Sequence, residues 1–296
     1  MAGRGGVINN IWDGIIPPEC QPNPSILRLS AALVWEEAHE PLHADIDFNR
    51  TCGVGPGMPF ASAVLERDSR FGIVGLVPCA VGGTGVSEWL RGTRLYDDLV
   101  RRAGAALENG GTIRAILWYQ GERDAVDRKD AEMYKQRLEK FILDLRTDLQ
   151  SSLLPVFQVA LASGQGPFVE TVRQAQLGIN LPNVMCVDAK GLPLEPDNLH
   201  LSTPAQVRLG EMLADSFLQT IPTPIQNYAP RSFKGKNSLV ITISVDEKEE
   251  LAENSHSSIR LGRRTDIDAN KACGCGVGLG PGNGMVFANL EFGPLL

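Results

Sequence analysis

The chain has 296 residues, of which 43% are apolar and 21% charged, enough for one large folded domain with an appendage. Its formal net charge of −7 excludes the clustered basic surface expected of a nucleic-acid-binding protein. No apolar run approaches the roughly 20 residues that a membrane-spanning helix needs, and no secretory signal is visible. We therefore expect neither a nucleic-acid partner nor a membrane partner, and the cytoplasm is the favoured compartment.

Short apolar strand candidates alternate with helical segments between residues 71 and 219, which is the pattern of an α/β fold with a parallel sheet. The predicted strands are residues 71–78, 113–119, 154–161 and 183–187. The predicted helices between them are residues 95–107, 131–149 and 168–179. A last helix is expected after Thr203, with the Thr203 hydroxyl as N-cap, Pro204 in the first helical position and Gln206 completing a capping box.

The first sixty residues are rich in Pro, Gly and Asn and are predicted to be loops, with residues 27–35 as their main apolar stretch. A parallel α/β sheet normally begins with a strand that leads into the first catalytic loop, and no such strand precedes Met1. We therefore expect the first strand of the sheet to be missing, which would leave an open place inside it and make the protein poorly soluble.

The segment after residue 221 has a different composition, polar and acidic at first and then rich in glycine. Residues 266–274 repeat residues 45–53 with the shared pattern Asp-Ile-Asp-x-Asn-basic-x-Cys-Gly. We interpret residues 1–221 as the folded domain and residues 222–296 as a linker with a degenerate partial duplication of the N-terminal region. Because such a short copy cannot build a core, the tail is expected to be dispensable. Cys273 and Cys275 lack the second pair that a zinc site needs, so no metal is expected.

Asp197 and His200 lie three residues apart, just before the last predicted helix. In an ester hydrolase a histidine takes the proton from a serine hydroxyl, and a carboxylate holds the histidine in the correct tautomer. Two side chains at this spacing on a loop can converge, so the pair is a candidate for that chemistry. Taken alone, the same pattern also fits a capped turn that carries a solvated histidine.

Two further segments follow predicted strands, at the sheet edge where such folds bind ligands. Gln120 comes directly after residues 113–119, and its amide can donate to an oxyanion. Gly82 and Gly83 follow residues 71–78, where glycine lets a backbone N–H come close to developing negative charge. Each segment also fits an ordinary turn.

These segments together resemble the plant carbohydrate esterases related to sialate O-acetylesterases, within the SGNH (GDSL) hydrolase superfamily. The resemblance runs from Met1 to about Ile221 and is carried by residues 1–6, 35–38, 53–57, 82–84, 118–122 and 197–200. It implies a three-layer α/β/α flavodoxin-like fold. It also implies hydrolysis of acyl esters on sugars, with acetyl as the favoured acyl group, and the use of no metal and no cofactor.

The resemblance further implies a role for particular residues. The catalytic residues are His200 as the general base and Asp197 as the carboxylate that orients it. The expected oxyanion donors are Gln120 and Gly83, with Gly82 as the less favoured alternative to Gly83. The expected substrate pocket is lined by Glu88, Trp89 and Glu122.

The chain departs from the family pattern in two places. The first family block reads Gly-Gln-Ser-Asn directly before Met-Ala-Gly-Arg-Gly, with the serine as nucleophile, and this chain starts at that Met. The nucleophile is therefore expected upstream of Met1 and the chain as given is expected to be inactive, since Ser163 follows a different strand. Arg123 stands where the family usually has Ser.

Two other functions compete with the esterase. The first is a non-catalytic product, either a sugar-binding remnant or a truncated protein without function. The second is nucleotide binding by the glycine-rich residues 53–57, but this segment lacks the preceding strand and the Lys-Ser/Thr pair of a phosphate-binding loop. The sequence does not identify the sugar or the oligomeric state.

Overall fold

A computed structural model describes residues 1–108, 110–221 and 238–244 of the chain. Its centre is a seven-stranded sheet in the order β4-β3-β5-β9-β6-β7-β8, parallel throughout except for the edge strand β4. Its strands are β3 (Ile26–Leu29), β4 (Trp35–Glu37), β5 (Val74–Pro78), β6 (Thr112–Tyr119), β7 (Val156–Ala160), β8 (Val184–Asp188) and β9 (Ser238–Ser244). A separate antiparallel pair consists of β1 (Val7–Ile8) and β2 (Ile11–Trp12).

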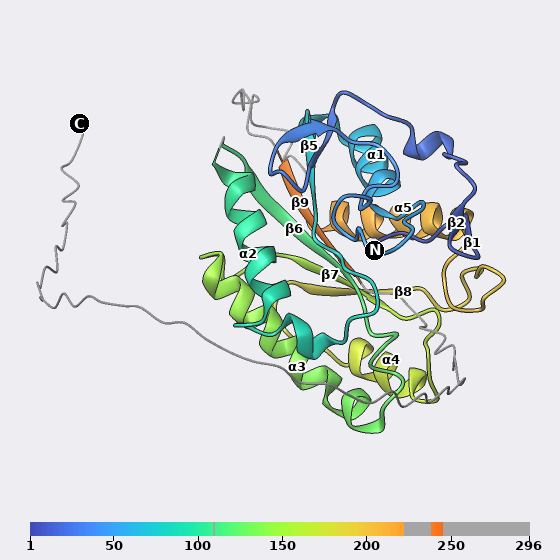
Figure 1. The fold of residues 1–296 in the computed structure, drawn as a ribbon. Coiled ribbons are helices and arrows are strands. Elements are labelled where there is room, and N and C mark those ends of the chain that lie inside the picture. The colour runs from blue at the N-terminus through green and yellow to red at the C-terminus, as the bar shows by residue number, and fades with distance from the viewer. Residues whose placement is uncertain (109, 222–237, 245–296) are drawn as a thin grey trace, which may run out of the picture. The chain divides into compact units, whose positions relative to one another are not determined.

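Helices cover both faces of the sheet (Figure 1). On one face lie α1 (Gly57–Arg67) and α5 (Thr203–Gln219). On the other lie α2 (Arg94–Leu107), α3 (Arg128–Asp148) and α4 (Val169–Leu177). Short 3-10 turns are η1 (Pro18–Cys20), η2 (Ser69–Phe71) and η3 (Val86–Trp89). This three-layer arrangement confirms the fold class expected from the sequence, and the predicted strands and helices between residues 71 and 219 are all present.

Aromatic side chains fill the core on both faces of the sheet. On the α3 side Trp118 packs against Trp89 and Phe141, with ring centroids 5.8 and 4.6 Å apart. On the α5 side Phe217 packs against Phe157 at 5.8 Å. β5 and β7 are buried along their whole length, as expected for strands covered on both faces. β5 is a continuous apolar run, whereas β7 contains the buried Gln158 among four apolar residues. With both faces covered, the carboxyl edge of the sheet is the place left for a ligand.

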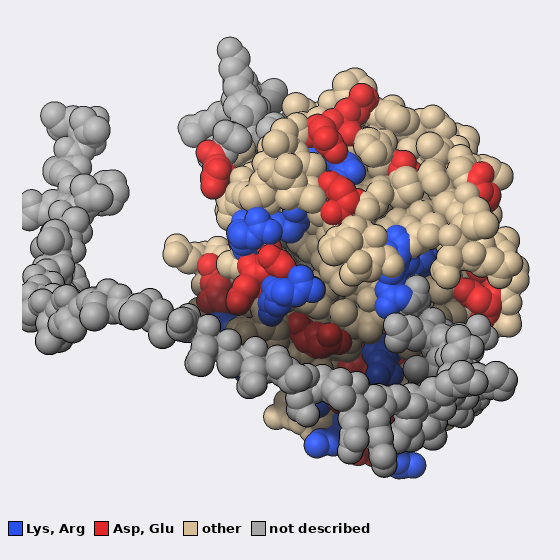
Figure 2. Space-filling model, viewed as in Figure 1, with Lys and Arg blue, Asp and Glu red and all other residues tan. Residues whose placement is uncertain are grey.

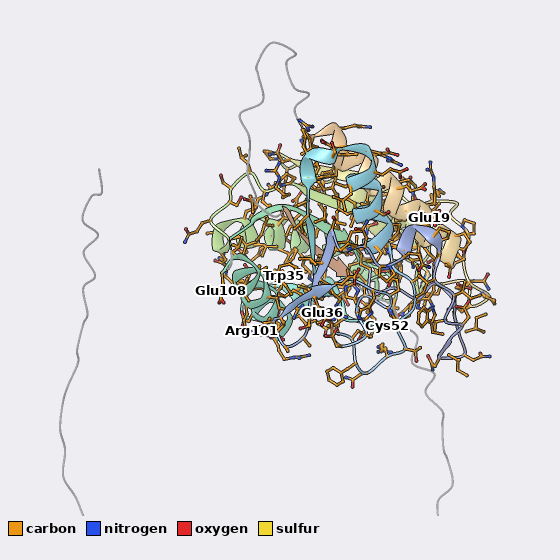
Figure 3. The ribbon with its side chains drawn as sticks, turned by 90° about the horizontal axis from the view of Figure 1, so that it is seen from above. Glu19, Trp35, Glu36, Cys52, Arg101 and Glu108 are labelled. Carbon is orange, nitrogen blue, oxygen red and sulfur yellow. The ribbon has the colours of Figure 1, made fainter. Side chains whose placement is uncertain are left out.

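The first sixty residues contain more regular structure than the sequence predicted. β3 pairs in parallel with β5, β4 forms the outer edge, and α1 starts at Gly57. Trp35 and Glu36 lie on this edge strand (Figure 3), where an exposed charge discourages pairing with a further strand. The prediction of loops from the Pro, Gly and Asn content was wrong for α1. Pro59 is compatible with this helix because a proline in the first turn removes no helical hydrogen bond.

The last helix begins as predicted at Thr203, but its capping differs. Ser202 occupies the N-cap position and no side chain caps the helix, so the prediction of Thr203 as N-cap was wrong by one residue. Further along α5, Gly210 allows close contact with α1. A Cβ atom at this position would lie 2.6 Å from Cγ of Pro59 and 2.7 Å from the carbonyl oxygen of Pro56.

β9 is an element of the sheet that the sequence analysis does not contain. It lies between β5 and β6 and pairs in parallel with both, as the orange strand of Figure 1 shows. The sequence analysis ended the folded domain at residue 221 and expected an open place in the sheet. In the structure, residues 238–244 of the predicted tail form this strand and occupy the place between β5 and β6. The repeat at residues 266–274 lies outside the described residues, as do Cys273 and Cys275.

Basic and acidic side chains are intermixed on the face shown in Figure 2. Among the ion pairs of the described residues, Arg91 pairs with Asp148 at 2.8 Å and with Asp144 at 3.2 Å. Within the described ranges, no helix is long and apolar enough to cross a bilayer.

Candidate active site

The loops that follow β5, β6, β7 and β8 are joined by hydrogen bonds at the carboxyl edge of the sheet. The amide Nε2 of Gln120, after β6, donates to the carbonyl oxygen of Thr84, after β5, at 3.2 Å. The Ser163 hydroxyl, after β7, donates to the carbonyl oxygen of Leu199, in the loop after β8. The structure therefore brings the three segments singled out in the sequence to the same edge.

Asp197 and His200 form a turn of their own in the loop between β8 and α5. Oδ1 of Asp197 accepts hydrogen bonds from the backbone N–H groups of Leu199 and His200, at 2.9 and 3.0 Å. Asn198 takes a positive φ of 58°, a conformation that asparagine tolerates and that reverses the chain between the two residues. The second carboxylate oxygen, Oδ2, contacts Nδ1 of His200. This is the His–carboxylate pair predicted from the spacing in the sequence.

The electrostatics of this pair favour an ionised carboxylate. Partial burial raises the pKa of Asp197, but the hydrogen bonds from His200 and from the backbone N–H of Leu199 outweigh it and hold the pKa below its ordinary value. The exposed fraction of the side chain is 42% for Asp197 and 11% for His200. A carboxylate on Nδ1 fixes the proton there, which makes Nε2 the nitrogen that can take up a proton.

The loop that carries the pair is closed by backbone bonds of its own and is anchored to the N-terminal segment by the side chain of Glu195. Glu195 N–H donates to the carbonyl oxygen of His200 at 2.7 Å, and Leu194 forms a bridge with Leu201. The carboxylate of Glu195 accepts from the backbone N–H of Gly6 at 2.8 Å. These bonds connect the loop to the N-terminal segment, a link that the sequence did not indicate.

Gln120 is completely buried and its amide group is fully engaged as a donor. Nε2 donates to the carbonyl oxygen of Thr84 and, at 2.5 Å, to Oδ2 of Asp124. The backbone oxygen of Gln120 accepts from Tyr134 Oη and from Gln176 Nε2, both at 2.8 Å. Oε1 accepts no hydrogen bond from the described residues. To donate to a substrate, the amide must therefore give up one of its two bonds, and the bond to Thr84 is the longer.

Asp124 links the loop after β6 to the loop after β5. Its carboxylate accepts from the backbone N–H of Val86, with distances of 3.2 and 3.1 Å to the two oxygens, in addition to the bond from Gln120. Burial raises the pKa of Asp124 to about 6, although the hydrogen bonds from Gln120 and Val86 act in the opposite direction. A carboxylate held with this much desolvation is a positioning group for the Gln120 amide.

The two glycines after β5 differ in the use of their N–H groups. Gly82 N–H donates to Oδ2 of Asp47 at 3.1 Å, and the same oxygen pairs with Arg4 at 3.0 Å. Gly83 takes a φ of 77°, and its N–H makes no hydrogen bond with the described residues. Of the two, Gly83 is therefore the one whose N–H can serve a ligand. Asp47 was noticed in the sequence only as part of the repeated segment.

The three residues expected to line a substrate pocket lie in different environments. Trp89 has no exposed surface, and its Nε1 donates to Oγ1 of Thr84 at 2.9 Å. In the structure Trp89 is a core residue that supports Thr84, and its expected role in the pocket stays a prediction. Glu88 is exposed and accepts from the backbone N–H of Gly85 at 2.8 Å, whereas Glu122 is buried.

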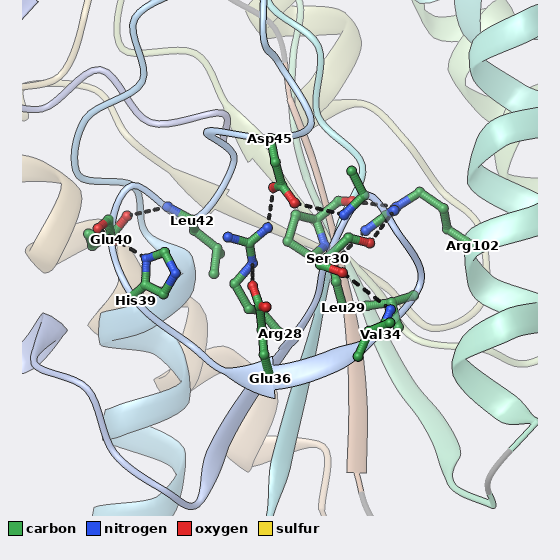
Figure 4. A network of polar contacts seen from close by, with 12 residues as sticks. Arg28, Leu29, Ser30, Val34, Glu36, His39, Glu40, Leu42, Asp45 and Arg102 are labelled. Carbon is green, nitrogen blue, oxygen red and sulfur yellow. Dashed lines mark hydrogen bonds and ion pairs between the residues drawn. The ribbon is translucent and has the colours of Figure 1, made fainter.

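Buried polar groups below the site were not predicted from the sequence (Figure 4). Arg28 is buried and pairs with Asp45 and, at 3.6 Å, with Glu36. Arg102, from α2, caps the ends of two strands by donating to the carbonyl oxygens of Leu29, Ser30 and Pro78. These long-range contacts fix the positions of the loops that leave β3 and β5.

Glu40 supports the glycine-rich segment at residues 53–57. Its two carboxylate oxygens accept from the backbone N–H groups of Leu42 and Gly55, at 2.8 and 3.3 Å. Burial raises the pKa of Glu40 to about 7 in spite of these bonds. The segment is thus held by a buried carboxylic acid, the opposite of what a phosphate-binding loop requires.

The hollow of about 290 Å³ in the described surface lies at the opposite edge of the sheet. It is lined by residues at the amino ends of β6, β7 and β8 and at the end of α5, among them Arg114, Asn183 and Thr220. None of the expected site residues lines it. In the same described part of the chain, no three His, Cys, Asp or Glu side chains gather in a way that could hold a metal ion.

Comparison with known proteins identifies the family. Residues 1–219 match the sequence model described as carbohydrate esterase, sialic acid-specific acetylesterase. The protein named "Probable carbohydrate esterase At4g34215", from Arabidopsis thaliana, is 58% identical over 227 residues, which cover 74% of this chain and 86% of the relative. The chain belongs to this carbohydrate esterase family, which confirms the resemblance seen in its sequence.

A solved structure gives the same assignment. The X-ray structure of the protein AT4G34215 from Arabidopsis thaliana aligns with a TM-score of 0.73 and 55% identity, over 75% of this chain and 95% of that one. The crystal structure of XAC1771, described as a novel carbohydrate acetylesterase from Xanthomonas citri, aligns with a TM-score of 0.45 and 18% identity, over 64% of this chain and 47% of that one.

Proposed function

We propose that this protein has the active-site arrangement of an esterase that hydrolyses acyl esters, foremost acetyl esters, on carbohydrates, with His200 as general base. The serine of the family's Gly-Gln-Ser-Asn block is not present in residues 1–296, so we propose that the chain as given is inactive. The observation that carries the proposal is the contact between Nδ1 of His200 and the carboxylate of Asp197, at the carboxyl edge of the sheet. Membership of the carbohydrate esterase family supports the substrate class.

In this proposal His200 works through its Nε2 atom. Asp197 keeps the proton on Nδ1, so that Nε2 can accept the proton of the attacking hydroxyl. The oxygen of that hydroxyl bonds to the ester carbonyl carbon, and negative charge develops on the carbonyl oxygen. His200 then gives its proton to the sugar oxygen as the bond from this oxygen to the acyl carbon breaks, which releases the sugar and leaves the acyl group on the attacking oxygen. A water molecule, deprotonated by the same Nε2, then attacks the acyl carbon and releases the acid, and the attacking group regains its proton.

The developing oxyanion is assigned to two donors that the sequence already suggested. The N–H of Gly83 is available in the described structure, whereas that of Gly82 is bound by Asp47. Gln120 contributes its amide when the bond to Thr84 is released. Glu88 and Glu122, carboxylates of the same two loops, are proposed to accept hydrogen bonds from sugar hydroxyls.

Sugar binding without hydrolysis is the second candidate, and one observation favours it. Ser163 lies in the loop after β7 and is buried. Its hydroxyl already donates a hydrogen bond to the carbonyl oxygen of Leu199. Ser163 is therefore not placed as an attacking group for His200.

A single set of measurements on the full chain decides between the two candidates. Hydrolysis of an aryl acetate and of an acetylated sugar is measured for the full chain extended at its N-terminus by a strand that ends in Gly-Gln-Ser-Asn. It is also measured for the same extended chain with His200→Ala or with the matched control His39→Ala. Hydrolysis that falls about 10³- to 10⁴-fold in His200→Ala but not in the control supports the esterase. Binding of the sugar in the absence of turnover, with no serine labelled by a fluorophosphonate, supports the binding protein instead.

A further inference from the structure

A strand from the tail completes the middle of the sheet. β9 pairs with β5 from Val74 opposite Ser238 to Pro78 opposite Thr242. On its other side it pairs with β6 as far as Tyr119 opposite Ser244. Both neighbours run parallel to it, so β9 is an interior strand of the sheet and not an edge strand.

Among the described strands, β9 alone joins the two halves of the sheet. In the observed strand order β5 and β6 do not pair with each other, and each uses one edge for β9. Without β9, the half formed by β4, β3 and β5 and the half formed by β6, β7 and β8 would each present a row of unpaired backbone groups. Such edges are costly inside a parallel sheet that helices cover on both faces.

The composition of β9 suits an interior strand. The segment Ser-Leu-Val-Ile-Thr-Ile-Ser contains four β-branched residues (Val240, Ile241, Thr242 and Ile243) and no charge. Buried parallel strands typically read as such apolar, β-branched runs. This strand lies beyond residue 219, where the match to the family model ends, and the sequence analysis did not recognise it as part of the sheet.

We propose that Ser238–Ser244 is an integral strand of the catalytic domain, which joins the two half-sheets and sets the distance between the loops after β5 and β6. Neighbouring strands lie about 4.8 Å apart, so one inserted strand holds β5 and β6 about 10 Å from each other. These two strands lead to Gly83 and Gln120. β9 ends at Ser244 opposite Tyr119, one residue before Gln120. The assignment of β9 does not depend on the esterase activity.

Hydrogen exchange on the full-length protein tests the proposal without any substitution. Amides of the peptide that contains residues 238–244 are expected to exchange on the order of 10³-fold more slowly than in an unstructured peptide, like those of β5 and β6. Exchange of this peptide at the unstructured rate, while β5 and β6 remain protected, would overturn the proposal.

A proline substitution provides the second test. Ile241 lies in the middle of β9, opposite Val77 and Ile116, where proline removes a ladder hydrogen bond. In the full chain Ile241→Pro is expected to lower the melting temperature by about 10 °C or to abolish folding. Ile241→Val, which keeps the β-branch, and Val277→Pro, which adds a proline in the tail beyond Glu250, are expected to melt like the parent. An unchanged melting temperature in Ile241→Pro would refute the proposal.

Discussion

The loop after β6 and the loop before α5 carry the two halves of the proposed chemistry, and they are built in opposite ways. Gln120 and Asp124 are buried, and their side chains bond to Thr84 and Val86 of another loop. Asp197 and His200 remain partly exposed and bond mainly to each other and to their own turn. The first half is held by tertiary contacts and the second by local ones.

The difference suits the two tasks. A general base has to meet solvent and leaving group, so its loop can be partly exposed and self-contained. Donors to an oxyanion act best when they are fixed in advance in a dry environment, which requires buried bonds to other elements. Substitutions of Asp197 or His200 should therefore lower activity without lowering stability. Substitutions of Gln120 or Asp124 should change both activity and stability.

The largest effect is expected for Asp197→Asn. Asn keeps an oxygen for the N–H groups of Leu199 and His200, so the turn is preserved. Its NH₂ group now faces Nδ1, which moves the histidine proton to Nε2 and removes the base. In the chain extended by Gly-Gln-Ser-Asn at its N-terminus, which is used for this and the following activity measurements, ester hydrolysis should fall about 10²- to 10⁴-fold with an unchanged melting temperature. Both are measured on the same sample, and a large loss of stability would contradict the local character of this turn.

Gln120→Ala should reduce both properties. Loss of one oxyanion donor is expected to lower kcat about 100-fold. The substitution also removes the donor to the carbonyl oxygen of Thr84 and to the carboxylate of Asp124, so the free energy of unfolding should fall by about 1–3 kcal/mol. Denaturant unfolding and aryl acetate kinetics measure the two effects. If kcat falls with no change in stability, the Gln120 loop is not held as described.

The contrast between the two halves also explains what could be predicted from the sequence. The Asp197–His200 pair was found because its partners are three residues apart and need only a turn. Gln120 bonds to Thr84 across 36 positions, and Gly82 bonds to Asp47 across 35. Contacts at such separations leave no periodic signal in the sequence. The hydrogen bonds that Gln120 makes with Thr84 and that Gly82 makes with Asp47 could therefore not be predicted.

The prediction of the fold from the sequence was limited for the same reason. β5 and β7 could be predicted because buried parallel strands are mostly apolar, and β7 has four apolar residues out of five. β9 is a run of the same kind, but its place in the sheet depends on pairing with β5 and β6, over a hundred residues earlier in the chain. Trp89 was expected in a pocket because the family resemblance implies a substrate site around Glu88 and Trp89. Its complete burial against Trp118 could only be seen in the folded chain.

Asp124→Asn should change the pH dependence of stability. Burial raises the pKa of Asp124 from 3.8 to about 6, so between these pH values the folded state binds more protons than the unfolded state. Stability of the parent therefore contains a contribution that is lost as the pH rises from about 4 to 6. The variant lacks it, so the difference in unfolding free energy, variant minus parent, should increase by about 2 kcal/mol over that range. Urea titrations at pH 4, 5, 6 and 7 measure this difference, and parallel curves would contradict the burial of an ionisable Asp124. Glu40, with a pKa raised to about 7, acts in the same direction but is common to both proteins.

The smallest effect is expected for Trp89→Phe, which tests whether this residue supports Thr84 or touches the substrate. Phe retains most of the packing against Trp118, but the hydrogen bond from Nε1 to Oγ1 of Thr84 is lost. The free energy of unfolding should fall by about 1 kcal/mol, the typical net contribution of one hydrogen bond. Because Trp89 has no exposed surface, KM for an acetylated sugar should remain unchanged while kcat falls slightly through the shift of Thr84 and Gln120. A rise in KM for the acetylated sugar, with KM for the aryl acetate constant, would show instead that Trp89 contacts the sugar and would restore the role expected from the sequence.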